Sequence, residues 1–233
     1  MTTKHILKPF DKDLGLVHEK VLGMAEMVYR ELTDCLQAFS DRDQEAAADA
    51  KAADFLINDS ERIIDKLVVN TIVLHQPMAS DCRQLIAALR IARELERIGD
   101  YATNISNHST TLDQLKITGE EQGVSDMGQA VERMMRDVIE AFSNQDASAA
   151  ESIRQHDEEI DKQYTQLFTN LIAINKSNVE LACACTHLIF IARSLERIGD
   201  HITDIAEEIL FVVNGDFPVD DRSKADTSAF IKG

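Results

Sequence analysis

The side chains in this sequence best suited to chemistry are carboxylates that recur every four residues. Side chains four residues apart lie on one face of an α-helix, so each series would form a ladder of oxygen atoms. Oxygen ligands favour hard cations, and the pattern predicts sites for Mg²⁺, Mn²⁺ or ferric iron, with Zn²⁺ as a further metal. The first carboxylate ladder comprises Asp54, Asn58, Glu96, Asp100 and Asn104, and the second comprises Asp157, Asp161, Glu196, Asp200 and Asp204.

The ladders have a second interpretation, as solvated helix faces without a metal. Carboxylates at this spacing repel each other by about 0.2–0.5 kcal/mol per pair, and a bound cation would remove that cost. Arginines at positions 93, 97, 193 and 197 alternate with the acids and could also neutralise them. The two interpretations stay open on the sequence alone. If metal binds, five carboxylates in the second ladder against three in the first predict that the second fills first.

Signatures of catalysis do not occur in the sequence. It contains no G-x-S-x-G, no P-loop and no G-x-G-x-x-G motif. No histidine stands three residues after a glutamate, as a ferritin-like di-iron site would require. His201 replaces Tyr101 of the other ladder's helix and is expected at the surface. These observations disfavour an enzyme, and the alternative that stays open is a phosphoesterase with a carboxylate-bridged metal pair.

The ladders belong to a repeat that covers most of the chain. IARELERIGDYATNI at 91–105 matches IARSLERIGDHITDI at 191–205 at eleven of fifteen positions. Upstream, AFSDRD at 38–43 pairs with AFSNQD at 141–146. The second half is therefore a copy of the first, and its ladder is a copy too.

Long helices must position these side chains. Nine Gly and three Pro among 233 residues are too few for a turn-rich β fold. Apolar residues between 191 and 212 alternate in spacings of four and three, which is typical of a left-handed helix bundle. We expect helices near 12–40, 42–75, 79–113, 124–144, 146–175 and 177–214.

The predicted fold class is all-α, with two tandem homologous three-helix bundles. The first repeat is expected at 1–118 and the second at 119–214, followed by a flexible C-terminal tail at 215–233. A single six-helix array is the alternative. On a helical wheel the ladders lie beside the apolar seam, next to small residues that include Gly99 and Gly199. A glycine inside a helix is costly, so we expect a close helix contact at both.

The charge of the chain limits its partners. A net charge of −17 and a pI of about 4.7 disfavour binding to nucleic acid or to an anionic membrane. The apolar stretch 181–192 is too short to insert across a bilayer, and the N-terminus does not look like a signal peptide. The four cysteines form no C-x-x-C pair, which fits reduced thiols. We therefore expect a cytoplasmic protein that binds cations or basic protein surfaces.

The sequence resembles the PhoU family. The resemblance rests on the doubled L-E-R-I-G-D at 95–100 and 195–200 and on QPMASDCR at 76–83, and it covers about residues 10–214. It implies two three-helix bundles and a non-enzymatic, cytoplasmic negative regulator of phosphate uptake and phosphate-starvation signalling. The implied partners are the ATPase subunit of the phosphate ABC transporter and the sensor histidine kinase of the phosphate two-component system. We also expect a homodimer.

The resemblance further implies multinuclear metal sites at E(D)-x-x-x-D motifs. By position these motifs correspond to the ten ladder residues. Asn58 and Asn104 stand where carboxylates are expected, so the first ladder should bind metal more weakly.

Overall fold

The computed structural model describes residues 8–42, 54–219 and 225–231, and within these ranges the regular structure is helical. The expected helices agree with the observed ones to within about five residues, except that residues 43–53 of the second lie outside the described ranges. The long helices are α1 (Lys8–Asp41), α3 (Asp54–His75), α4 (Ser80–Leu112), α5 (Glu121–Asn144), α6 (Ala147–Ser177) and α7 (Ala182–Asn214). Two short 3₁₀ helices, η1 (Val179–Leu181) and η2 (Ser228–Phe230), complete the described elements.

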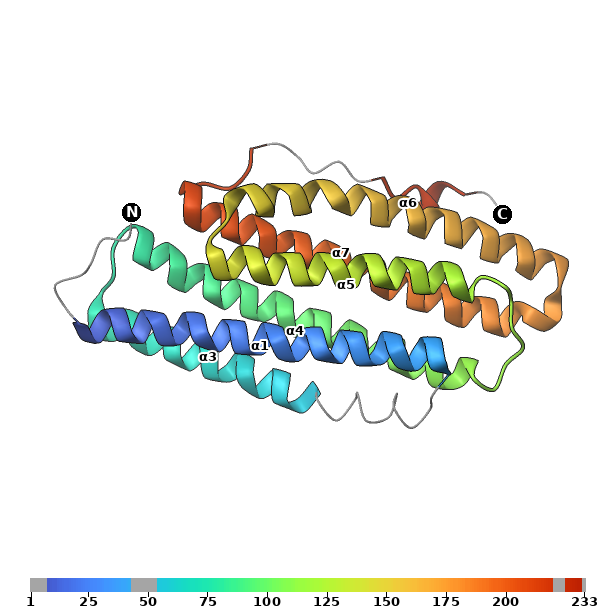
Figure 1. Cartoon of the computed structure of the whole chain (residues 1–233), viewed down its shortest axis with the longest axis horizontal. Helices are drawn as coiled ribbons and strands as arrows, with labels where there is room; N and C mark the ends of the chain where they lie inside the picture. Colours follow the sequence, from blue (N-terminus) through green and yellow to red (C-terminus); the bar gives the residue numbers. More distant parts are fainter. Residues whose placement is uncertain (1–7, 43–53, 220–224, 232–233) are drawn as a thin grey trace.

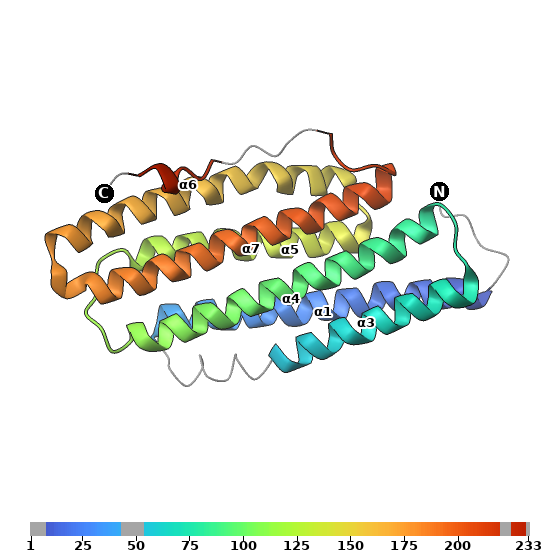
Figure 2. The same cartoon turned by 180° about the vertical axis from the view of Figure 1, so that it is seen from behind.

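The long helices form two three-helix bundles that lie side by side (Figure 1). Helices α1, α3 and α4 make up the first bundle and α5, α6 and α7 the second, as the sequence repeat predicts. Successive helices within each bundle run in opposite directions (Figure 1). The last helices of the two repeats, α4 and α7, cross at the centre of the molecule and share its most extensive helix contact (Figure 2).

Specific residues fix the helix ends between these elements. The side chain of Asp146 accepts hydrogen bonds from the backbone N–H groups of Ser148 and Ala149 and so caps α6. Gly215 follows α7 with a φ of 92°, the left-handed conformation in which glycine commonly ends a helix. In the second bundle, capping residues therefore fix the start of α6 and the end of α7, the two helices that carry the ladder.

One apolar core runs through both bundles. Leu95 and Ile98 of α4 and Leu195 and Ile198 of α7 are buried in the same cluster. Each such side chain contributes about 1.5–3 kcal/mol through burial of its apolar surface. The repeats are thus separate bundles in topology that share a core across α4 and α7.

Close helix contacts occur at the two predicted glycines. A Cβ atom on Gly199 would lie 3.2 Å from Oδ1 of Asp157 on α6, and one on Gly99 would lie 3.3 Å from Cδ1 of Ile57 on α3. Both ladders therefore border a tight contact between the second and third helices of their bundle. None of the described helices has the length and apolar character needed to cross a bilayer.

Candidate functional site

Four residues of the second ladder lie in the contact between α6 and α7, whereas the fifth, Asp204, lies near Glu94 of α4. Asp157 and Asp161 on α6 and Glu196 and Asp200 on α7 are buried, whereas Asp204 is exposed. Burial of four carboxylates in one contact is costly unless their charges are compensated.

Arginines on the same helix compensate part of this charge. Nη1 of Arg193 lies 3.1 Å from Oε1 of Glu196, and Nη1 of Arg197 lies 3.5 Å from Oδ2 of Asp200. Burial raises the pKa of Glu196 above its ordinary value, although Arg193 and Arg197 act in the opposite direction. The arginine pairing that the sequence leaves open is therefore present in the second ladder.

The C-terminal segment 225–231 covers the second ladder. The backbone N–H of Ala225 donates to Oδ2 of Asp161 at 2.7 Å. Oδ2 of Asp226 lies 3.2 Å from Nη1 of Arg193, and its Oδ1 accepts a hydrogen bond from the hydroxyl of Thr165. The mobility of the tail at 215–233 stays a prediction. Residues 225 and 226 are held by polar contacts, which an analysis of apolar spacing in the sequence does not detect.

Hydrogen bonds also keep the carboxyl group of Asp226 ionised. Burial by itself would raise the pKa of Asp226, but the backbone N–H and the hydroxyl of Ser228, together with the charge of Arg193, outweigh it and lower that pKa. The segment thus places the carboxylate of Asp226 next to Arg193, which also pairs with the buried Glu196.

The first ladder is more open. Asn58 and Asp100 are partly buried and Asn104 is exposed, while the side chain of Asp54 lies outside the described part of the chain. Arg97 on α4 places Nη1 3.6 Å from Oδ2 of Asp100. The exposed fraction of the Asp100 side chain is 43%, against 11% for the equivalent Asp200. The two ladders therefore share a motif and differ in environment.

The ladders fit a bound metal only if these contacts open. Arginines lie within ion-pair distance of Glu96, Asp100, Glu196 and Asp200, and a backbone amide occupies an oxygen of Asp161. A cation would have to displace some of these partners.

Within the described ranges, ligand atoms of three or more His, Cys, Asp or Glu residues approach within 4.8 Å of one another at one place. That place is the group Glu94, His201 and Asp204, which could hold a metal ion. Nδ1 of His201 lies 2.6 Å from Oε2 of Glu94, and the ring of Tyr101 stacks on the imidazole with centroids 5.6 Å apart. We call this the inter-repeat group, because Glu94 belongs to α4 and the other two residues to α7.

Sequence reasoning missed two members of the inter-repeat group. Glu94 lies outside the four-residue series, and the sequence predicts a surface position for His201, whose side chain is partly buried, with 20% of it exposed. A signal was nevertheless present in the repeat. Segments 91–105 and 191–205 differ at four positions. At three of the four, one residue of the pair belongs to the inter-repeat group and the other is its equivalent in the other repeat: Glu94 and Ser194, Tyr101 and His201, Asn104 and Asp204.

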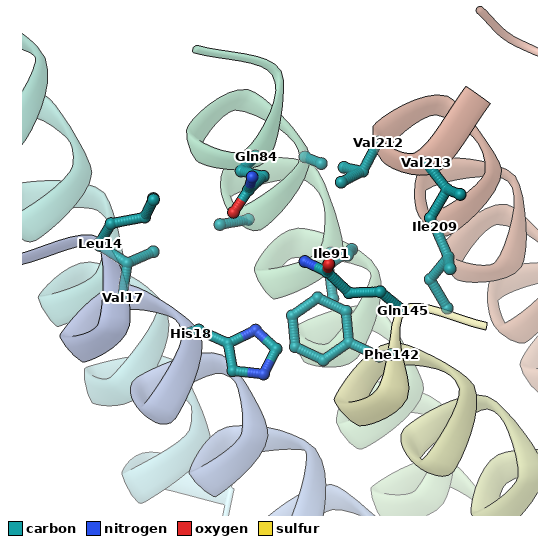
Figure 3. A pocket seen from close by; sticks show the side chains of 12 residues that line it. Leu14, Val17, His18, Gln84, Ile91, Phe142, Gln145, Ile209, Val212 and Val213 are labelled. Carbon is teal, nitrogen blue, oxygen red and sulfur yellow. The ribbon is translucent and has the colours of Figure 1, made fainter. Parts of the chain in front are cut away.

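A small apolar pocket lies where α1, α4, the end of α5 and α7 meet (Figure 3). Val17, Ile91 and Ile209 contribute to its walls, and His18 stacks on Phe142 with ring centroids 4.7 Å apart. Its volume of about 30 Å³ has room for roughly one or two water molecules. The pocket is therefore too small for a phosphate-containing metabolite.

Comparison with known proteins covers both repeats. The PhoU domain model matches residues 21–108 and 124–209. The "phosphate-specific transport system accessory protein PhoU homolog" of Xylella fastidiosa strain Temecula1 is 34% identical over 225 residues, which cover 97% of this chain and 93% of that protein. The homolog of the same description from Caulobacter vibrioides strain NA1000 is 33% identical and is covered over 98% of its length.

Two solved structures share the fold. The crystal structure of PhoU from Pseudomonas aeruginosa aligns with a TM-score of 0.87 at 31% identity, covering 89% of this chain and all of that one. The phosphate transport system regulatory protein PhoU from Streptococcus pneumoniae aligns with a TM-score of 0.83 at 30% identity, covering 90% and 99% of the two chains.

Proposed function

The chain belongs to the PhoU family, and on that premise we propose that it is a negative regulator of phosphate uptake and of phosphate-starvation signalling. It acts as a cytoplasmic adaptor rather than as an enzyme. The observation that carries this proposal is the match of both repeats, over nearly the full length, to accessory proteins of phosphate-specific transport systems.

The proposed partners are the ATPase subunit of the phosphate ABC transporter and the sensor histidine kinase of the phosphate two-component system. The names of the relatives, which place them with a phosphate transport system, support the first partner. The net charge of −17 supports docking on basic protein surfaces through complementary charge.

We further propose that the protein is a homodimer. Support comes from the outer face of α3 and the turn after it, where Phe55, Val73, Leu74 and Met78 are exposed. Exposed apolar side chains that are close together in the chain, such as Val73, Leu74 and Met78, favour burial in a protein contact. Light scattering should give twice the mass of 26.0 kDa for the wild type. It should give a larger monomer fraction for Val73→Glu.

The ladders are the proposed sites of hard cations, Mg²⁺, Mn²⁺ or ferric iron, with Zn²⁺ as a further metal. The second ladder, with more carboxylates, should fill first, so Asp200→Asn should lower Mn²⁺ binding more than Asp100→Asn does. Calorimetric titration of both variants and the wild type measures this. Equal and very weak binding by all three would leave the ladders as arginine-paired helix faces.

A deletion strain tests the regulatory proposal. Without the protein, phosphate-starvation genes should stay active in phosphate-rich medium and phosphate uptake should rise, and a plasmid copy should restore repression. Normal repression in the deletion strain would contradict the proposal. Affinity capture from cells grown with and without phosphate tests the two partners. Phosphatase activity of the purified protein with added Mn²⁺ would instead support the metalloenzyme alternative.

A further inference from the structure

Three side chains from the two repeats meet across the contact between α4 and α7. We infer that the inter-repeat group of Glu94, His201 and Asp204 is a binding site for a divalent transition metal of the Zn²⁺ or Co²⁺ class, and that the bound ion fastens the first repeat to the second. The inference rests on this geometry and does not depend on the proposed regulatory function.

The donor set selects the class of metal. One imidazole nitrogen with two carboxylate oxygens suits Zn²⁺ and its neighbours, whereas the oxygen-only ladders suit harder cations. Two carboxylates and a neutral imidazole carry two negative charges, which a divalent ion neutralises. A fourth position remains for water, as is usual for sites with three protein ligands.

The distances allow the site to form with small side-chain movements. Nδ1 of His201 and Oε2 of Glu94 are 2.6 Å apart, and the three ligand atoms lie within 4.8 Å of one another. Zinc lies ~2.0–2.2 Å from nitrogen and oxygen ligands, which sets tetrahedral ligand atoms ~3.3–3.5 Å apart. Metal binding therefore replaces the hydrogen bond between His201 and Glu94. The ligating Nδ1 gives up any proton that it carries, and the neutral imidazole holds its one proton on Nε2.

The surroundings orient the ligands and favour a cation. Tyr101 stacks on the imidazole of His201, and both Glu94 and His201 are mostly shielded from solvent. Glu208 lies close enough to Glu94 for the two charges to interact unfavourably. Arg90 is within ion-pair distance of Glu208, at 3.1 Å. An added positive charge next to Glu94 would relieve the repulsion that remains.

The repeat supplies a matched control for each ligand. The equivalent positions in the other copy carry Ser194, Tyr101 and Asn104, that is, a hydroxyl, a phenol and an amide in place of two carboxylates and an imidazole. The substitutions Glu94→Ser, His201→Tyr and Asp204→Asn therefore introduce residues that the same fold already accommodates at the same place in its other half.

Cobalt spectroscopy on the full chain tests the site. The wild type should bind one Co²⁺ with visible d–d absorption bands, and Zn²⁺ should displace it and raise the melting temperature. Loss of an inner ligand should weaken Zn²⁺ binding by more than the ~10–100-fold cost of losing an outer-shell partner, so His201→Tyr and Glu94→Ser should lack the bands. Glu196→Gln, in the second ladder, should keep them.

Wild type without these bands, or variants that keep the wild-type bands and Zn²⁺ affinity, would overturn the inference and leave a hydrogen bond between the repeats. Far-UV circular dichroism of the metal-free variants separates loss of a ligand from loss of fold. Asp204→Asn is the safest variant in this respect, because Asp204 is exposed. Repression of phosphate-starvation genes is a separate readout, so the regulatory proposal can fail or hold independently.

Discussion

The two repeats share an apolar seam, but the equivalent acidic residues beside it differ in burial and in their contacts. Side chains of Glu96 and Glu196 are 18% and 6% exposed, although they occupy the same place in identical L-E-R-I-G-D motifs. The second repeat adds the C-terminal segment, which covers Asp161 and pairs Asp226 with Arg193. The first repeat has a partly buried Asn58 where Asp161 stands.

This difference shows that duplicating a motif does not duplicate a site. The seam is apolar in both copies, with Ala102 against Ile202 as its difference between 91–105 and 191–205, because every position in it is buried in the common core. The acids border that core, and their properties depend on what lies across from them. Equivalent substitutions in the seam should therefore change the stability of the protein by similar amounts in the two repeats, whereas equivalent substitutions beside the seam should have different effects.

The largest expected effect tests the shared seam. Leu95 and Leu195 are equivalent and both buried. Leu95→Ala and Leu195→Ala should each lower the free energy of unfolding by about 2–5 kcal/mol, because each leaves a cavity in the core. Urea denaturation measures both. A large effect at one position and none at the other would break the equivalence of the two seams.

The glycines beside the seam should separate the repeats. Alanine gains about 1 kcal/mol of helix propensity over glycine, but a Cβ at 199 would press on a buried carboxylate oxygen of Asp157 at 3.2 Å. At 99 it would lie 3.3 Å from the flexible end of Ile57, and the nearest carboxylate oxygen, Oε2 of Glu31, would be at an ordinary contact distance of 3.5 Å. We expect Gly99→Ala to be nearly neutral and Gly199→Ala to destabilise by about 1–2 kcal/mol. Thermal melts of both variants compare them, and the reverse order would contradict the difference in packing.

Removal of the C-terminal segment should have a smaller effect on stability. A chain that ends at residue 219 loses polar contacts to Asp161, Thr165 and Arg193, and partly exposed contacts of this kind contribute at most about 1 kcal/mol. Hydrogen exchange should speed up locally around α6 while α3 is unchanged. Equal changes in both helices would show that the segment stabilises the whole molecule rather than one ladder.

The smallest effects concern the two ends of the contact between α4 and α7. Arg90 pairs with Glu208 at one end, and at the other the equivalent positions hold Phe190 stacked on His108. Burial, with a contribution from His187, lowers the pKa of His108. Burial raises the pKa of Glu208 despite Arg90.

These shifts give pH dependences of opposite sign. The unfolded chain binds a proton at His108 more readily than the folded chain, so this group makes stability fall as the pH drops below about 6.5. The folded chain binds a proton at Glu208 more readily, so this group makes stability rise as the pH drops toward the carboxyl range. Urea denaturation between pH 7.5 and 4.5 measures both effects. His108→Gln should remove the loss of stability at low pH that His108 causes, and Glu208→Gln should remove the gain of stability that Glu208 causes. Variants that keep the wild-type pH profile would contradict both assignments.

The sequence predicts the fold well because the relevant signals are local. Alternating spacings of four and three around Leu195 define the helix face that is buried, and the repeat extends the same result to Leu95. The close helix contacts at Gly99 and Gly199 were predictable for the same reason.

The candidate sites are harder to predict because they depend on contacts between distant segments. The cover on Asp161 comes from residue 225, and the contact of Glu94 with His201 depends on how α4 and α7 align. Neither follows from spacing along one helix. The positions at which the repeats differ, such as Tyr101 and His201, were the one signal in the sequence that pointed to the inter-repeat group.

Carboxyl footprinting by mass spectrometry tests the difference between the ladders most directly. In the native protein a carbodiimide-activated amine should label Glu96 and Asp100 faster than Glu196 and Asp200, which are less exposed. Removal of the C-terminal segment should raise labelling at the second ladder and leave the first unchanged. Equal labelling of the two ladders in the intact chain would contradict the claim that the repeats share a core but not a site.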